Sequence, residues 1–435
     1  MNGSDTLHRK LYKNASWLFG GKAASSIFTT VQLIIIARFL ELSEYGLLET
    51  VIAYVGMLNL LLDFNVWETA TKYIGSFWAD NQKDKVCSMI KLSYTIDIST
   101  GILAFIIVIL TAGIANKYFI KTDTAFVFIY IYAFSLLVDT ANSTSDAILR
   151  VFDKFKKIAY ISSIQNFIRL ALVLFFLIYD WSIKGILLAY VLASIFGFFY
   201  RLMTVHKVLV ENDLRHWYKA RISLLKDHRK EILWFIANTS FAATLKASTD
   251  KYLGVLLLGF FSTKEAVGLY KIAKSFTQVI SRFSNPLHEA IYPELVKIKS
   301  SNQITNLIDL IKRSTITLVK ISIPLVIVMI LFPEQILNIV VGTKYIEASN
   351  VLRILIIAVF ISQLTFWTAP TFLALGKPGL RTMIQLVSTL VYIILILLLV
   401  PEYAHIGAAL ALLGHAFTKS VISVSSLKRI MGKNK

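Results

Sequence analysis

The feature that most constrains this chain is a succession of apolar runs, each about 20 residues long, that follow one another along nearly its whole length. A helix of that length crosses the hydrocarbon core of a bilayer. Hydrophobic residues make up 56% of the 435 residues and charged residues only 16%, and the charges are concentrated in the gaps between the runs. Because this composition is too apolar for a soluble domain, the sequence predicts an all-α polytopic membrane protein.

Twelve transmembrane helices are predicted, at residues 14–38, 45–70, 89–113, 124–149, 158–179, 185–206, 232–258, 267–290, 314–332, 351–375, 382–400 and 405–427. With the N-terminus placed in the cytoplasm, the inner segments hold 31 Lys and Arg residues and the outer segments hold 6. Basic residues accumulate in cytoplasmic loops, so this asymmetry predicts that both termini are cytoplasmic. The net charge of +19 follows from the same loops and does not indicate a nucleic-acid-binding face.

Two related turns lie about half a chain apart. One apolar helix ends at Arg38 and the next begins at Tyr45-Gly46-Leu47, while Val267-Gly268-Leu269-Tyr270 opens a later helix in the same way. Positions 46 and 268 are 222 residues apart, which suggests an internal duplication. We therefore expect two pseudo-symmetric six-helix lobes joined by a basic cytoplasmic linker, with the N-terminal lobe at 1–206, the linker at 207–231 and the C-terminal lobe at 232–435.

Polar residues inside the predicted spans fall on common helical faces. Ionisable groups within a membrane are costly and usually face a bundle interior or a water-filled cavity. Six residues of the eighth span recur at steps of three and four, and most of those that are charged are basic: Lys271, Lys274, Gln278, Arg282, Asn285 and Glu289. We expect a hydrated, partly cationic lumen between the lobes that neutralises an anionic headgroup. The alternative, that these groups form buried ion pairs between helices, stays open.

Two sets of lumen residues are predicted. The substrate-binding, cationic set comprises Lys22, Arg169, Lys246, Lys251, Lys271, Lys274 and Arg282. The set that lines the lumen or binds a coupling ion comprises Asn59, Asp63, Asp139, Asn142, Asp146, Asp250, Gln278 and Asn285. Na⁺ or H⁺ is the expected coupling ion.

The sequence gives no indication of catalytic chemistry. The single cysteine, Cys87, excludes an intramolecular disulfide and a cysteine-based metal site. Walker A, HExxH and GxSxG motifs are absent from the sequence, and the isolated His288 and His415 do not suggest a metal site. We expect neither an enzyme nor a protein with a bound cofactor or metal.

Several short motifs occur in the order seen in one family. The segments Ala37-Arg38-Phe39-Leu40 and Glu44-Tyr45-Gly46-Leu47 resemble the first hairpin of polysaccharide flippases, with Glu41 where that family usually has Gly. Further segments resemble the family's seventh and eighth helices: Asp250-Lys251-Tyr252-Leu253, Gly259, Val267-Gly268-Leu269-Tyr270 and Pro293-Glu294-Leu295. The chain thus resembles the polysaccharide/O-antigen repeat-unit flippases of the multidrug/oligosaccharidyl-lipid/polysaccharide (MOP) exporter superfamily.

This resemblance implies a MATE-like fold whose lobes are related by a pseudo-two-fold axis. It implies a multi-pass protein of the bacterial inner membrane that moves an undecaprenyl-pyrophosphate-linked oligosaccharide, an O-antigen or capsule repeat unit, to the outer leaflet by alternating access. Membrane lipids, a glycan polymerase and glycosyltransferases are the implied partners.

Three other functions are weighed against this expectation. A multidrug/cation antiporter of the same fold would be expected to have an acidic lumen, which the basic eighth span disfavours. A membrane glycan polymerase or ligase normally needs a sizeable outer loop with catalytic residues, and the outer loops here are short. A scaffold within a glycan-assembly complex is distinguished by a transport assay.

Overall fold

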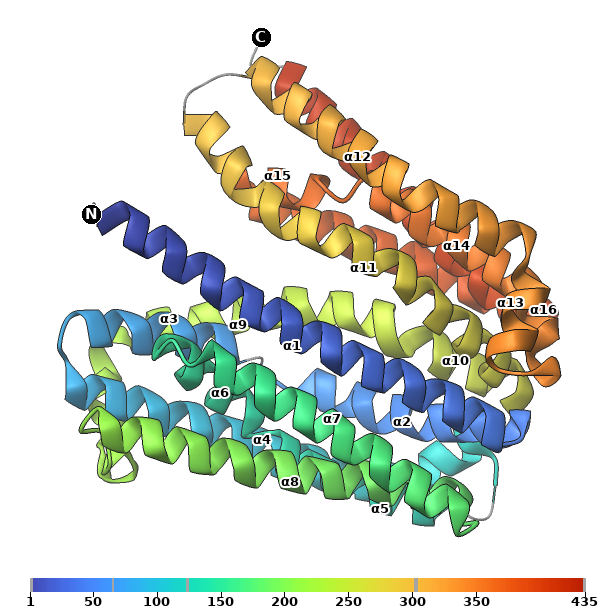
Figure 1. Ribbon diagram of the computed structural model, residues 1–435, viewed down its shortest axis with the longest axis horizontal. Helices are drawn as coiled ribbons and strands as arrows, with labels where there is room; N and C mark the ends of the chain where they lie inside the picture. Colours follow the sequence, from blue (N-terminus) through green and yellow to red (C-terminus); the bar gives the residue numbers. More distant parts are fainter. Residues whose placement is uncertain (1–2, 65, 123–124, 301–303, 433–435) are drawn as a thin grey trace. The chain divides into compact units, whose positions relative to one another are not determined.

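The structure is a computed structural model that describes residues 3–64, 66–122, 125–300 and 304–432 (Figure 1). Helices are the regular elements throughout this part of the chain, so the predicted all-α fold is confirmed. The chain forms two compact units. The first comprises Met1–Leu40 and Val51–Ser248, and the second comprises Glu41–Thr50 and Thr249–Lys435. The predicted lobe boundaries at residues 206 and 232 stay a prediction.

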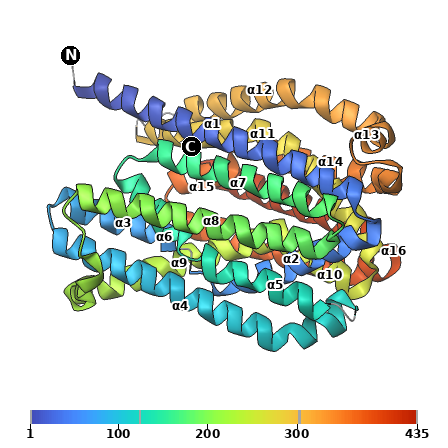
Figure 2. The ribbon, with the colours of Figure 1, turned by 60° about the horizontal axis from the view of Figure 1, so that its bottom comes forward.

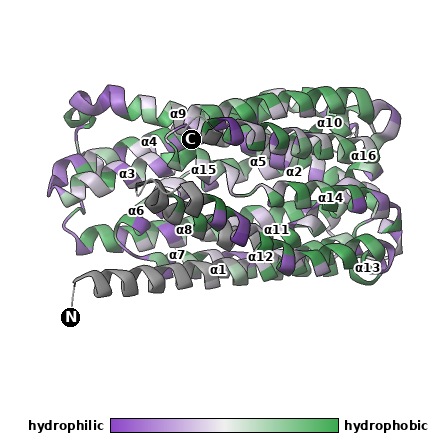
Figure 3. Cartoon of the chain, turned by 90° about the horizontal axis from the view of Figure 1, so that it is seen from above, coloured by the Kyte–Doolittle hydropathy of each residue, from purple (hydrophilic) through white to green (hydrophobic). Residues whose placement is uncertain are grey.

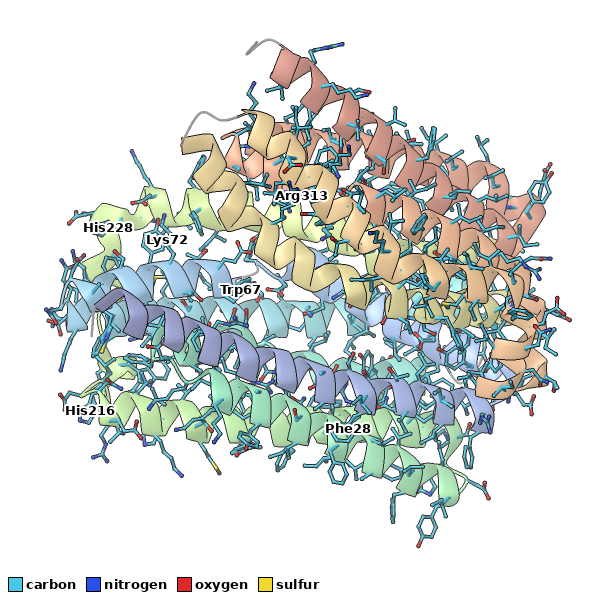
Figure 4. All side chains as sticks on the ribbon, turned by 45° about the horizontal axis from the view of Figure 1, so that its top comes forward. Phe28, Trp67, Lys72, His216, His228 and Arg313 are labelled. Carbon is cyan, nitrogen blue, oxygen red and sulfur yellow. The ribbon has the colours of Figure 1, made fainter. Side chains whose placement is uncertain are left out.

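The first unit is a bundle of long helices. Its elements are α1 (Gly3–Phe39), most of α2 (Leu42–Leu62), α3 (Val66–Ala79), α4 (Lys83–Ala115), the π-helix η1 (Asn116–Ile120), α5 (Ala125–Asp139), α6 (Asn142–Val151), α7 (Phe155–Ile178), α8 (Ser182–Glu211), η2 (Trp217–Lys219), η3 (Ile222–His228) and α9 (Arg229–Ala247). Helix α7 packs between α1 and α8, and α5 packs against α4 and α8 (Figure 2). The ring centroids of Phe28 on α1 and Phe167 on α7 are 5.6 Å apart (Figure 4).

Two of the predicted spans are each broken into two helices. The span at 45–70 is interrupted after Leu62, and the span at 124–149 is interrupted after Asp139. A new helix start leaves backbone N–H groups without intrahelical partners. At the start of α6 the carboxylate of Asp97 accepts hydrogen bonds from the Thr144 amide at 3.1 Å and the Thr144 hydroxyl at 2.6 Å. A side chain from α4 therefore caps α6 from outside and stabilises the break.

The predicted linker is a structured part of the first unit. Helix α8 continues to Glu211, and η2 and η3 follow it. On α4, the Ser88 hydroxyl donates to the Arg221 carbonyl at 3.0 Å and the Lys91 ammonium donates to the Ala220 carbonyl at 2.9 Å. Leu225 is buried in the same hydrophobic core as α3 and α4. The segment 207–231 is therefore docked along α4.

Salt bridges connect the acidic residues of this segment to the bundle. They are Lys83–Asp213 at 3.1 Å, Lys154–Glu211 at 3.2 Å and Lys72–Glu231 at 3.3 Å. Figure 4 labels Lys72 on α3, whose ammonium also lies 4.3 Å from the centre of the Phe235 ring. Hydrogen bonds from the Tyr73 hydroxyl and from Lys72 hold the pKa of Glu231 below its ordinary value. Because these pairs are largely exposed, each contributes little to the stability of the docked segment.

The second unit is built around a long helix, α11 (Lys264–Ser300). Helix α11 packs against α10, α12, α14, α15 and α16. The unit's other elements are most of the π-helix η4 (Ser248–Tyr252), α10 (Leu253–Phe261), α12 (Ile304–Leu331), α13 (Pro333–Val340), η5 (Thr343–Ala348), α14 (Ser349–Leu364), α15 (Thr368–Ala374) and α16 (Pro378–Gly432).

Element α16 is a hairpin of two helices. The backbone of Ala404 is non-helical, with φ 44° and ψ −122°. A methyl group added to Gly407 would overlap the carbonyl oxygen of Leu399, and the rings of Tyr392 and His415 lie 5.7 Å apart. Residues on either side of Ala404 thus face one another, so the chain reverses there and the predicted spans 382–400 and 405–427 form its two arms.

Eight segments of the described chain are long and apolar enough to cross a membrane. Apolar colour runs along most of their length in Figure 3. They are Leu42–Leu62, Lys83–Ile120, Ala125–Val151, Phe155–Ile178, Ser182–Glu211, Ile308–Leu331, Thr343–Ala374 and Pro378–Ile430. The predicted spans 14–38, 232–258 and 267–290 are not among them; in the first, the apolar helix Ala23–Phe39 is shorter. The chain is a multi-pass helical membrane protein, whereas the count of twelve spans and the cytoplasmic termini stay predictions.

Candidate functional site

The two related turns meet inside the second unit. A methyl group added to Gly46 would overlap the Lys264 carbonyl oxygen and lie 3.1 Å from the Gly268 nitrogen. One added to Gly268 would lie 2.8 Å from the Leu42 carbonyl oxygen and 3.4 Å from the Gly46 nitrogen. Both turns need glycine because their backbones approach too closely for a side chain. We call this the glycine contact.

An ion pair lies one helical turn beyond the glycine contact. The Lys271 ammonium is 2.8 Å from the Glu49 carboxylate, and the two side chains are 24% and 13% exposed. Positions 49 and 271 are 222 residues apart, the same separation as positions 46 and 268. Corresponding positions of the two turns thus carry opposite charges and pair with each other. This is the arrangement expected where two repeats meet at a pseudo-two-fold axis.

The first turn also makes an aromatic contact with η5 of the second unit. The Tyr45 ring meets the Tyr345 ring of η5 edge-on, with centroids 6.0 Å apart, and both side chains are fully buried. Together with the glycine contact and the Glu49–Lys271 ion pair, this explains why Glu41–Thr50 belongs to the second unit, whereas the rest of α2 belongs to the first.

A buried polar network crosses the first unit. It comprises Asp139 of α5, Asn142 and Asp146 of α6, Gln165 and Arg169 of α7, and Ser194 and Arg201 of α8. The carboxylate of Asp139 accepts hydrogen bonds from the Asn142 amide at 3.0 Å and the Ser194 hydroxyl at 3.1 Å. The charges of Arg169 and Arg201 both act on Asp139. The network therefore balances two carboxylates with two guanidinium groups.

Arg201 is the most enclosed cation of this polar network. It is 7% exposed, its Nε donates to the Asp146 carboxylate at 3.2 Å and its Nη1 donates to the Gln165 carbonyl oxygen at 2.8 Å. A methyl group added to Gly197, one turn earlier, would lie 2.5 Å from the Gln165 amide. Glycine at that position thus lets α7 and α8 approach closely enough for Gln165 to reach Arg201.

An aromatic layer joins this polar network to α1. The Arg169 guanidinium lies 5.2 Å from the centre of the Tyr190 ring, a cation–π distance. The Tyr190 hydroxyl accepts a hydrogen bond of 2.7 Å from the amide of Gln32, which is 5% exposed. Sequence analysis missed Gln32, Tyr190, Ser194 and Arg201 as site residues. A glutamine within an apolar run was the available signal for Gln32. Arg201 was missed because it lies near the end of the predicted span 185–206, where a basic side chain usually reaches the membrane surface.

The other predicted lumen residues lie in different settings. Four of them come together in the polar network: Arg169, Asp139, Asn142 and Asp146. Lys271 pairs with Glu49. The exposed ones are Lys246, Asp250, Lys251 and Gln278, and the half-buried ones are Asn59 and Asp63. The side chains of Lys22, Arg282 and Asn285 lie outside the described residues. That these residues contact a substrate stays a prediction.

Comparison with known protein families shows which family the chain belongs to. The sequence profile of the family described as "Polysaccharide biosynthesis protein" matches residues 11–299. The chain belongs to the polysaccharide biosynthesis protein family. The predicted relationship to polysaccharide flippases of the MOP superfamily is thereby confirmed.

Two relatives of this family member come from a bacterium and an archaeon. The chain is 20% identical over 354 residues to "Inner membrane protein YghQ" of Escherichia coli, covering 80% of this chain and 97% of that one. It is 27% identical over 160 residues to "Probable low-salt glycan biosynthesis flippase Agl15" of Haloferax volcanii, covering 37% and 34%.

Two solved structures share the fold. The lipid II flippase MurJ in an inward closed conformation superposes with a TM-score of 0.75 at 17% identity, covering 94% of this chain and 87% of that one. An inward-facing multidrug resistance MATE transporter of the MOP superfamily superposes with a TM-score of 0.76 at 13% identity, covering 94% and 95%. The predicted MATE-like fold is confirmed by both.

The contacts of Arg201 in the polar network predict how much this residue stabilises this polysaccharide biosynthesis protein. We expect Arg201→Ala to lower the free energy of unfolding by about 3 kcal/mol, because it leaves the Asp146 carboxylate and the Gln165 amide buried without their partner. Arg201→Lys should recover only part of the loss, because an ammonium lacks the planar fork that reaches both groups. Thermal denaturation in detergent measures the effect, with the exposed Arg215→Ala as the matched control. Equal midpoints for the Arg201→Ala and Arg215→Ala variants would contradict the assignment.

Proposed function

We propose that this protein is a flippase that moves an undecaprenyl-pyrophosphate-linked oligosaccharide, an O-antigen or capsule repeat unit, from the inner to the outer leaflet of the bacterial inner membrane. The match to the polysaccharide biosynthesis protein family over residues 11–299 carries this proposal. The name of the relative Agl15, a glycan biosynthesis flippase, supports the reaction, and the name of YghQ, an inner membrane protein, supports the location. Twelve spans with both termini cytoplasmic and two six-helix lobes complete the proposed architecture.

The physical problem is to move a sugar chain across hydrocarbon. Each hydroxyl that loses its hydrogen bonds on the way would cost several kcal/mol, a barrier that a polar, hydrated path removes. We propose that basic groups neutralise the pyrophosphate while the polyprenyl tail stays in the lipid. Alternating access then exposes the sugar first to one side and then to the other, driven by a Na⁺ or H⁺ gradient. A glycan polymerase and glycosyltransferases are the proposed partners.

The basic face of α11 supports an anionic substrate over an organic cation. Lys271 and Lys274 lie one helical turn apart on that helix, within a fold that MATE transporters also use. A cation antiporter would be expected to have a lumen dominated by acidic residues. We therefore propose a transporter without catalytic activity. Translocation of a lipid-linked glycan in a transport assay distinguishes it from a membrane polymerase or ligase.

A double variant tests the proposed role of the basic face. We expect Lys271→Ala/Lys274→Ala to abolish translocation of a labelled undecaprenyl-pyrophosphate oligosaccharide in proteoliposomes, because the pyrophosphate loses its counter-charges. The matched control is Lys312→Ala/Lys320→Ala on the exposed surface of α12, which tests whether any loss of two lysines has the same effect. Membrane insertion is checked by fractionation. Wild-type translocation by the Lys271/Lys274 double variant would exclude these two lysines from the transport path.

A further inference from the structure

Three basic nitrogens in the described part of the second unit are buried without a hydrogen-bond partner. They are Nζ of Lys274 on α11 and, on the second arm of α16, Nδ1 of His405 and Nε2 of His415. His415 is only 5% exposed, and Lys274 is one of the charged groups that act on it. Buried polar groups of native proteins are almost always hydrogen-bonded, so the orphaned nitrogens of Lys274 and His415 require a physical explanation.

Two tyrosines connect these bases. The Lys274 ammonium lies 5.4 Å from the centre of the Tyr270 ring, and the His415 ring lies 5.7 Å from the Tyr392 ring. Both tyrosines are fully buried, and their hydroxyls meet at Gly254, where an added methyl group would lie 2.8 Å from the Tyr270 oxygen and 2.5 Å from the Tyr392 oxygen. Elements α10, α11 and both arms of α16 therefore enclose one polar cluster, formed by Tyr270, Lys274, Tyr392 and His415.

The charges around His415 come from three elements. Lys274 acts on it from α11, Asp250 from η4 and Lys419 from its own helix, and Tyr392 of the opposite arm packs against its ring. Helices α10 and α15, which also contact α16, contain no ionisable residue. The single ionisable residue of α14, Arg353, donates hydrogen bonds to the Asn350 side chain and to the Ile330 carbonyl. Among the described residues, the carboxylate that acts on His415 is that of Asp250, which is an exposed residue.

The electrostatics limit how many protons this cluster can hold. Two positive charges in an enclosed, largely apolar site repel each other strongly, and the exposed Asp250 offsets only part of that repulsion. A cluster with one added proton avoids this repulsion, and the faces of the neighbouring tyrosine rings stabilise its charge. The cluster is thus built to gain and lose a single proton.

We propose that Lys274 and His415 form a proton-binding site, and that this proton is the ion coupled to transport. The second clause rests on the flippase function proposed above. Lys274 lies one helical turn from Lys271, which pairs with Glu49 beside the glycine contact. A proton gained or lost at Lys274 therefore changes the electric field at the Glu49–Lys271 ion pair. Protonation of the site can thus affect the glycine contact between the two related turns.

The proton site is tested first without transport. The protonation of histidine imidazoles is followed by NMR of ¹⁵N-histidine-labelled protein in nanodiscs, and His415 is identified by the signal lost in His415→Gln. We expect Lys274→Met to move the titration of His415 to higher pH, because it removes a neighbouring positive charge. Lys320→Met, on the exposed surface of α12, is the control and should leave that titration unchanged. A His415 titration that is the same in wild type and Lys274→Met would overturn the site, and Lys274→Gln provides a second variant if Lys274→Met does not fold.

The coupling is tested in proteoliposomes with a labelled undecaprenyl-pyrophosphate oligosaccharide. We expect an imposed pH gradient to accelerate translocation by the wild type at least tenfold, and His415→Gln to lose this acceleration while it retains exchange without a gradient. The exposed His216→Gln should respond like the wild type. Full acceleration in His415→Gln, or acceleration by a Na⁺ gradient alone, would overturn the coupling. Absence of any translocation by the wild type would instead contradict the proposed function, while the NMR titration would still decide the proton site.

Discussion

Replacing Glu49 with Ala should lower the free energy of unfolding by about 2–3 kcal/mol. The Lys271 ammonium would lose the carboxylate that lies 2.8 Å away, and it would remain three-quarters buried without a counter-charge. The cost is below that of a fully buried pair because both side chains retain some contact with solvent. The shift of the thermal denaturation midpoint in detergent measures this loss.

The reciprocal charge exchange is the control for this ion pair. Because Glu49 and Lys271 occupy corresponding positions of the two turns, Glu49→Lys/Lys271→Glu should restore much of the stability that either single substitution removes. A double-mutant cycle isolates their coupling from the other contacts that each residue makes. Additive losses in the cycle would show that the two side chains do not stabilise each other.

Replacing Gly46 with Ala should destabilise the protein by about 3 kcal/mol or more. Its methyl group would overlap the backbone carbonyl oxygen of Lys264, and a backbone atom cannot move aside as the end of a flexible side chain can. The first turn would have to separate from the start of α11, which would also draw Glu49 away from Lys271. The loss is measured as a fall in the denaturation midpoint and in the yield of folded protein.

Another helical glycine provides the matched control. Gly113 of α4 has no atom within 4 Å of the position that an added methyl group would occupy. Gly113→Ala should therefore be neutral or stabilise the protein by up to about 1 kcal/mol, since it only restricts the unfolded chain. Equal effects of Gly46→Ala and Gly113→Ala would contradict the glycine contact.

Hydropathy and spacing predicted much of the fold because the bilayer imposes helix length directly. Most of the apolar runs fall within observed helices, although two of them are broken, and the predicted face of Lys271, Lys274 and Gln278 does lie on a continuous helix, α11. The similarity of the two turns at Gly46 and Gly268 was visible in the sequence. Their direct contact was not, because sequence separation does not reveal which surfaces of two repeats meet.

The parts that could not be predicted depend on contacts distant in the sequence. The break between α5 and α6 is stabilised by Asp97, 47 residues before the Thr144 that it caps. Arg201 lies near the end of the predicted span 185–206, where a charge usually reaches the interface, but α8 continues to Glu211 and Asp146 and Gln165 enclose Arg201. Periodicity identifies polar faces; it does not identify the partner that neutralises each charge.

The most direct test of the proposed flippase is the leaflet accessibility of a labelled undecaprenyl-pyrophosphate oligosaccharide in proteoliposomes. An impermeant reagent or enzyme that modifies the sugar reports how fast the label reaches the far leaflet, with protein-free vesicles as the control. We predict protein-dependent translocation that accelerates under an imposed ion gradient. Export of organic cations without movement of any lipid-linked glycan would contradict the account and identify the protein as a multidrug antiporter of the same fold.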